Sequence, residues 1–156
     1  MLKPALLIAC LALPLGANAM SPRPGWQVLE TDKPYAALLA DLKTAVAAAK
    51  MGVVTEAGPT EAAASRGVTI PGNRVVGVFR NDFAVRALAL SEAAMIEAPI
   101  RFYVTEDAGG GATLSWKTPS HVFAPYADGG AGLAALAEEL DAIFAAIGAA
   151  ATEQVR

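Results

Sequence analysis

The segment Ile100–Lys117 constrains the fold of this chain more than any other, because its pattern predicts a β-hairpin. Apolar and polar side chains alternate at its start, which places Phe102 on the core face of a strand and Arg101 on the other face. The glycines Gly109–Gly111 then allow a tight turn, and Trp116 lies on the core face of the returning strand. We therefore predict two adjacent antiparallel strands here.

Apolar periodicity and turn-forming residues predict the elements on either side of this hairpin. Apolar residues recur at three- and four-residue spacing after Pro34, and Gly52 ends that helix. A longer stripe of the same spacing runs from Leu133 to Ile147. These patterns predict strands at Trp26–Thr31, Val53–Thr55, Arg74–Arg80, Ile100–Thr105 and Ala112–Lys117, helices capped by Asp32, by Thr60 and by Asn81 or Asp82, and a last helix after Gly129 and Gly130.

Glycine and proline positions add three local expectations. The third strand is almost wholly apolar, so we place it centrally in the sheet, with Gly77 at a close approach or bulge. Pro119 ends the fifth strand, and we expect Ser120–Tyr126 to be irregular. Gly148 is expected to begin the frayed end of the last helix.

The element order β-α-β-α-β-α-β-β-α predicts an α+β domain, with an antiparallel or mixed sheet and helices on one face. We assign this single domain to residues 26–150 and a tail to residues 151–156. Hydrophobic residues make up 54% of the chain, but many of them are alanine, which adds helix propensity more than buried area. We expect a thin core and a partly open sheet face, which favours a homodimer.

The first nineteen residues have the pattern of an export signal, with Lys3 before an apolar run and small residues at positions 17 and 19. We predict cleavage between Ala19 and Met20, a linker at residues 20–25, and a periplasmic or secreted protein. Two alternatives remain. The run could be a permanent anchor, although it is shorter than the roughly 20 residues of a spanning helix, or Cys10 could be the acylated cysteine of a lipoprotein.

Charge and composition argue against several classes of partner. The formal net charge is −3, and no basic run could neutralise a nucleic-acid backbone, so we expect no nucleic-acid partner and no stable membrane span. Cleavage after Ala19 would remove Lys3 and Cys10, which changes the charge to −4 and leaves no thiol. With one histidine, His121, we also expect no metal site and no cofactor.

Catalytic candidates are few. His121 could act with Glu106 and Asp107, the carboxylates at the end of the fourth strand, and a triad with Ser115 or Ser120 can also be written. No nucleophile-elbow motif accompanies these residues. The alternatives are that His121 is a packed loop residue and that the two carboxylates serve ordinary turn chemistry before the glycines.

A group of cationic and polar residues is the stronger binding candidate. We predict that a small anion is bound where a strand end meets a helix start, and the residues proposed for it are Arg80, Asn81, Asp82, Arg86 and Arg101. The alternative is that Asn81 and Asp82 cap the helix and the arginines are their ion-pair partners. Four aromatic residues are candidates for the lining of an apolar pocket, with membership of the core as the alternative, and these are Tyr103, Trp116, Phe123 and Tyr126.

Three blocks of sequence, Val78–Asp82, Ala98–Asp107 and Leu114–Ser120, resemble the family called domain of unknown function 302. The resemblance extends from about Tyr35 to the last helix. The family pattern often has glycine where Arg80 stands and proline where Asp82 stands, so the turn after the third strand is expected to differ. The resemblance implies a small, often dimeric α+β fold without an established activity.

Together these features predict a periplasmic module that binds a small ligand or a partner protein, and we favour binding over catalysis. The alternative is a small hydrolase or isomerase that uses His121 with Glu106 and Asp107. The separation of His121 from the two carboxylates distinguishes the two hypotheses, since acid–base catalysis needs them within hydrogen-bonding reach.

Overall fold

The structure, a computed structural model, describes residues 20–153, so the predicted signal segment and the last three residues lie outside the described part. Its five strands form one sheet in the order β1-β5-β4-β3-β2, and every neighbouring pair is antiparallel. This confirms the α+β class and decides for the antiparallel alternative. The strands are β1 (Trp26–Thr31), β2 (Gly52–Ala57), β3 (Asn73–Phe79), β4 (Ile100–Glu106) and β5 (Ala112–Lys117).

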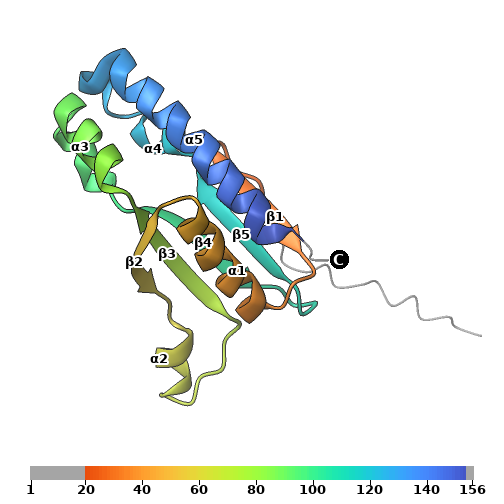
Figure 1. Cartoon of the computed structure of the whole chain (residues 1–156). Helices are drawn as coiled ribbons and strands as arrows, with labels where there is room; N and C mark the ends of the chain where they lie inside the picture. Colours follow the sequence, from red (N-terminus) through yellow and green to blue (C-terminus); the bar gives the residue numbers. More distant parts are fainter. Residues whose placement is uncertain (1–19, 154–156) are drawn as a thin grey trace, which may run out of the picture.

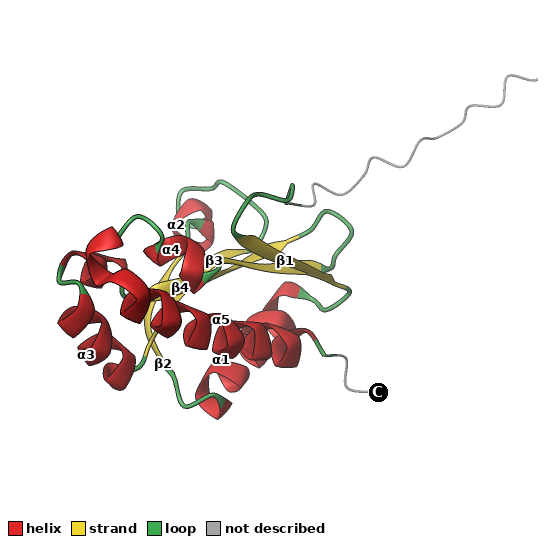
Figure 2. Cartoon of the chain, turned by 90° about the horizontal axis from the view of Figure 1, so that it is seen from above, coloured by secondary structure: helices red, strands yellow, loops and turns green. Residues whose placement is uncertain are grey.

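Two long helices cover one face of this sheet. Figures 1 and 2 show α1 (Tyr35–Ala48) and α5 (Gly130–Thr152) side by side on that face. α1 turns Leu38 and Leu42 inward, and both are fully buried. The shorter helical segments lie toward the two ends of the sheet (Figure 1), and they are α2 (Thr60–Ala64), α3 (Asn81–Leu90), η1 (Ala93–Glu97), α4 (Pro119–Phe123) and η2 (Ala127–Gly129).

The core lies between the sheet and the two long helices. Phe102 of β4 is at its centre, with its ring 5.3 Å from that of Trp116 and stacked at 4.6 Å on that of Phe144 in α5. All three rings are buried. Offset aromatic packing of this kind adds about 0.5–1.5 kcal/mol per pair beyond the buried area. The predicted hairpin thus supplies the strands against which the last helix packs.

Gly77 and Gly148 both permit close packing, but only one had the predicted role. A side chain at Gly77 in β3 would meet Thr55 and Pro99, so the predicted close approach is confirmed. Gly148 does not end the last helix. It lies buried within α5, where an added side chain would meet the Trp116 ring, and the helix continues to Thr152.

The segment after β5 also differs from its prediction. Instead of being irregular, it forms α4, in which Pro119 occupies the first turn and the Thr118 hydroxyl accepts a hydrogen bond from His121 N at 3.3 Å. Proline is favoured at this position, because the first helical N–H groups need no partner within the helix. The sequence signal that ends the strand is therefore also the signal that begins a helix.

The helix caps expected elsewhere are wrong. α1 is preceded by Pro34 rather than capped by Asp32, and Thr60 is the first residue of α2, donating its hydroxyl to Pro71 O instead. Arg80 occupies the N-cap position of α3, so Asn81 and Asp82 lie within the helix and neither caps it. Asp82 accepts hydrogen bonds from the Arg80 side chain instead. The turn after β3 is thus held by an arginine–carboxylate pair.

Candidate functional site

Both long helices of residues 20–153, α1 and α5, lie on one face of the sheet, so neither covers the opposite face (Figure 2). We call this surface the open face. The strand register determines its residues, because partners in an antiparallel ladder point to the same side. They are Trp26 and Val28 of β1, Ser115 and Lys117 of β5, Arg101 and Tyr103 of β4, and Val75 and Gly77 of β3. Ser115 and Gly77 are buried among their neighbours, and the others are at least partly exposed.

A groove of about 470 Å³ lies on the open face. Its volume is within the range of roughly 300–1,000 Å³ found for small-molecule sites. Apolar and aromatic side chains form much of its lining, together with two cations and one carboxylate. The lining residues that matter below are Trp26, Val75, Glu97, Arg101, Tyr103 and Lys117.

The cations of the groove lie in one row across the sheet. Trp26 pairs with Lys117, and Arg101 pairs with Gly77 on the other side. Because Phe102 pairs with Trp116, the same register continued by one residue places Arg101 opposite Lys117. Two like charges at directly opposed positions repel, which is unfavourable unless an anion lies near them.

These cations also have no ion-pair partner in the described chain. Residues 20–153 contain ten basic residues, the twelve of the sequence less Lys3 and Arg156, and five of them form ion pairs. Arg101 and Lys117 are not among those five. Lys117 Nζ lies 5.8 Å from the centroid of the Trp26 ring, and Arg23 contacts the same ring at 5.7 Å. The groove therefore has a local positive charge in an acidic protein.

The predicted arginine cluster is only partly brought together. Arg80 holds Asp82 through contacts of 2.7 and 3.1 Å, and Arg86 holds Glu139 of α5 through contacts of 2.8 and 2.6 Å. Arg80 and Arg86 also lie over the ring of Phe83, at 4.2 and 5.2 Å. The hydrogen bonds from Arg80 and Arg86 hold the pKa values of Asp82 and Glu139 below their ordinary values.

The remaining two members of that cluster do not join this ion-pair network. Asn81 is an exposed first residue of α3. Arg101 lies on the open face, whereas Arg80 lines an apolar pocket beneath α3. The ion-pair alternative thus describes Arg80 and Arg86, and Arg101 remains as an unpaired cation at the groove.

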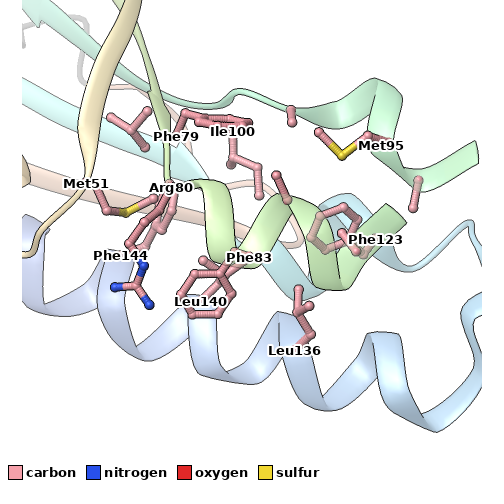
Figure 3. A pocket seen from close by; sticks show the side chains of 15 residues that line it. Met51, Phe79, Arg80, Phe83, Met95, Ile100, Phe123, Leu136, Leu140 and Phe144 are labelled. Carbon is pink, nitrogen blue, oxygen red and sulfur yellow. The ribbon is translucent and has the colours of Figure 1, made fainter. Parts of the chain in front are cut away.

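That apolar pocket is small, with a volume of about 40 Å³, and lies between α3, α5 and the sheet (Figure 3). Arg80 is the one charged residue in its lining, and Met51, Met95 and Phe123 are among the rest. A space of this size holds no drug-sized molecule. It is a packing gap in the core beside α3.

The catalytic candidates lie at opposite ends of the sheet. His121 follows β5 in α4 and is exposed, whereas Glu106 and Asp107 lie at the other end of the hairpin. The strand between them spans about 16 Å, at a rise of roughly 3.3 Å per residue. Gly72 N donates to Glu106 Oε2 at 2.6 Å, and the Thr113 hydroxyl donates to Asp107 Oδ2 at 2.8 Å. The structure therefore brings no carboxylate of this pair to His121.

The predicted aromatic pocket divides between core and groove. Trp116 and Phe123 are buried, as the core alternative predicts, whereas Tyr103 lines the groove. The Tyr126 hydroxyl donates to Glu97 Oε1 at 2.6 Å, and this hydrogen bond raises the pKa of Tyr126. Glu97, the carboxylate of the groove, thus has a partner of its own.

Sequence reasoning missed Trp26 and Lys117 as site residues. Each belongs to a predicted strand, and alternation alone places each on a definite face. What the sequence lacks is the pairing of β1 with β5, which joins segments far apart in the chain. The available signal was the outward position of Lys117 beside the buried Trp116.

Two kinds of feature are absent from residues 20–153. No group of three or more histidine, cysteine, aspartate or glutamate side chains in this part of the chain is arranged to hold a metal ion. Within the same residues, none of the helices combines the length and the apolar character needed to cross a bilayer.

The family model for "Domain of unknown function DUF302" matches residues 27–150, so the chain belongs to this family. A solved structure, the uncharacterized conserved protein DUF302 from Bacillus stearothermophilus, is similar with a TM-score of 0.74. It is 14% identical, and the match covers 84% of this chain and all of that one. A comparison with curated proteins gave no match.

Proposed function

We propose that this chain is an exported binding module that uses the groove of the open face to hold its ligand or partner. The observation that carries the proposal is the groove itself, where aromatic side chains and two unpaired cations meet on a sheet face that α1 and α5 leave free. Concave sites with apolar walls and a few polar groups are typical of small-ligand binding. The separation of His121 from Glu106 and Asp107 favours binding over hydrolysis or isomerisation.

The test is native mass spectrometry of the protein purified under mild conditions from the cells that make it. We expect a mass above that of the processed chain by that of a retained small molecule, or a complex with a partner protein. A bare monomer with no bound molecule, isolated from several growth conditions, contradicts the proposal.

Export and dimerisation belong to the same proposal. The export-like pattern of residues 1–19 supports cleavage after Ala19, and a mass spectrum of the intact purified chain should begin at Met20. A retained first segment contradicts cleavage, and an acyl group on Cys10 supports the lipoprotein alternative instead. Exposed apolar side chains near α3, Val85, Leu88 and Ile96, support a homodimer as the surface that a second copy would cover.

A further inference from the structure

We infer that the groove of the open face binds a small organic anion with a flat apolar body, for which an aromatic carboxylate is the simplest representative. The inference rests on the proposed function, since it names the ligand class for the same groove. Two independent features of the groove point to this class. The two adjacent cations, Arg101 and Lys117, specify the charge of the ligand, and the aromatic walls specify its apolar body.

The charge follows from the row of Arg101 and Lys117. Both side chains are exposed, they face the same side of the sheet at adjacent strand positions, and neither has an ion-pair partner in residues 20–153. An anionic head group between them would remove their mutual repulsion and accept charge-assisted hydrogen bonds from both. A guanidinium beside an ammonium suits a carboxylate or a phosphate, which share this head-group chemistry.

The remaining carboxylate of the groove does not neutralise this pair. Glu97 lines the groove, but its Oε1 accepts a hydrogen bond from the Tyr126 hydroxyl at 2.6 Å. Glu97 forms no ion pair with either cation within residues 20–153. With two cations and one carboxylate in its lining, the groove keeps a net positive charge.

The apolar body follows from Trp26 and Tyr103, which are neighbours of the two cations on the open face. Trp26 of β1 pairs with Lys117 of β5, and Tyr103 lies two residues after Arg101 in β4. A flat ring can pack against these two side chains, which both line the groove, with its carboxylate toward the cations. A compact inorganic anion would leave the aromatic walls in water.

The experiment titrates the full processed protein with three probes while its amide and indole N–H signals are followed by nuclear magnetic resonance. The probes are 2-naphthoate, the neutral 2-naphthamide and inorganic phosphate. The chain contains two tryptophans, so two indole signals are expected. Trp26 lines the groove, whereas Trp116 also packs in the core at 3% exposure. A Trp26→Phe variant assigns the two signals.

We expect 2-naphthoate to shift the Trp26 indole signal far more than that of Trp116, and to bind at least tenfold more tightly than either 2-naphthamide or phosphate. Arg101→Met and Lys117→Met should each weaken 2-naphthoate binding about tenfold, the size expected for one charge-assisted hydrogen bond. Both cations are exposed, so the variants should fold. Arg66→Gln is the matched control, because Arg66 is an exposed cation outside the groove without an ion-pair partner in the described residues.

The other outcomes separate this inference from the proposed function. Equal binding of the carboxylate and the amide at the Trp26 signal overturns the anionic class and leaves the groove as a binding site. Tighter binding of phosphate than of 2-naphthoate overturns the apolar body. No shift with any probe, in a protein that mass spectrometry shows to be a bare monomer, overturns both. An unchanged affinity in both methionine variants also overturns the inference.

Discussion

At the scale of single residues, two glycines show that the role of a residue can depend on tertiary packing and not only on its local sequence. Gly148 is a helix-ending signal in the sequence, but in the structure it is the point where α5 contacts the Trp116 ring. Gly77 was predicted to mark a close approach, because a glycine within an apolar strand has no other local reason. The same residue type thus gave one correct and one wrong prediction, because the outcome depends on a partner distant in sequence.

Replacement of Gly148 by alanine tests this packing. Alanine in a helix gains about 1 kcal/mol over glycine in propensity, but the added methyl would lie 2.8 Å from Trp116 Cζ3. That ring is fixed against Phe102, and overpacking of a well-packed site costs about 1–3 kcal/mol. We therefore expect Gly148→Ala to lower the free energy of unfolding measured by urea denaturation.

Gly132→Ala in the same helix is the control. Its methyl would meet the end of Leu90, a side chain that is 37% exposed and able to move. The propensity term should prevail there, so the free energy of unfolding should stay equal or rise. A Gly148→Ala protein as stable as Gly132→Ala contradicts the packing account.

At the scale of elements, the structure depends on contacts between distant segments, which a single sequence does not reveal. The hairpin and the two long helices follow from local alternation and periodicity, so they were predictable from residues such as Phe102, Leu38 and Leu133. α4 was missed because Pro119 serves both as a strand end and as the first turn of a helix. Arg101 lies apart from the other residues of the predicted anion site, because its register places it on the open face, whereas Arg80 follows β3 and lies over the Phe83 ring of α3.

The ion pair between Arg86 of α3 and Glu139 of α5 predicts that the stability of the protein depends on pH. The Arg86 side chain holds the pKa of Glu139 below its ordinary value, through their hydrogen bonds first and their charges second. The stabilisation is present above the unfolded-state pKa of Glu139 and is lost as the pH falls through its folded-state pKa. Both side chains are about half exposed, so solvent screens the pair and its contribution is small.

Arg86→Met should raise the pKa of Glu139 toward that of an ordinary glutamate, as measured by nuclear magnetic resonance titration of the side-chain carboxyl carbon. Lys50→Met removes a cation outside the ion pairs of the described chain and should leave the pKa of Glu139 unchanged. A Glu139 pKa that is the same with and without Arg86 contradicts the assigned cause.

At the scale of the whole molecule, the two faces of the sheet have different roles. One face carries the core beneath α1 and α5, and the other carries the groove with its two cations. The sequence predicted this division in outline, since helices on one face and a partly open second face follow from the element order. It did not reveal the groove, because Trp26, Lys117 and Arg101 come together only through the β1-β5-β4 register.

The most direct test of the open face as the binding surface compares thiol labelling of Val75→Cys and Val76→Cys. These neighbours point to opposite faces: Val75 lines the groove, and Val76 is fully buried beneath the helices. Mass spectrometry of the modified peptides gives both rates, in the cells that make the protein and in purified protein freed of bound molecules. We predict that Val75→Cys labels slowly in cells and rapidly after purification, while Val76→Cys labels slowly in both. Rapid labelling of Val75→Cys in both settings would contradict occupancy of the open face, and labelling of Val76→Cys as fast as Val75→Cys would contradict its geometry.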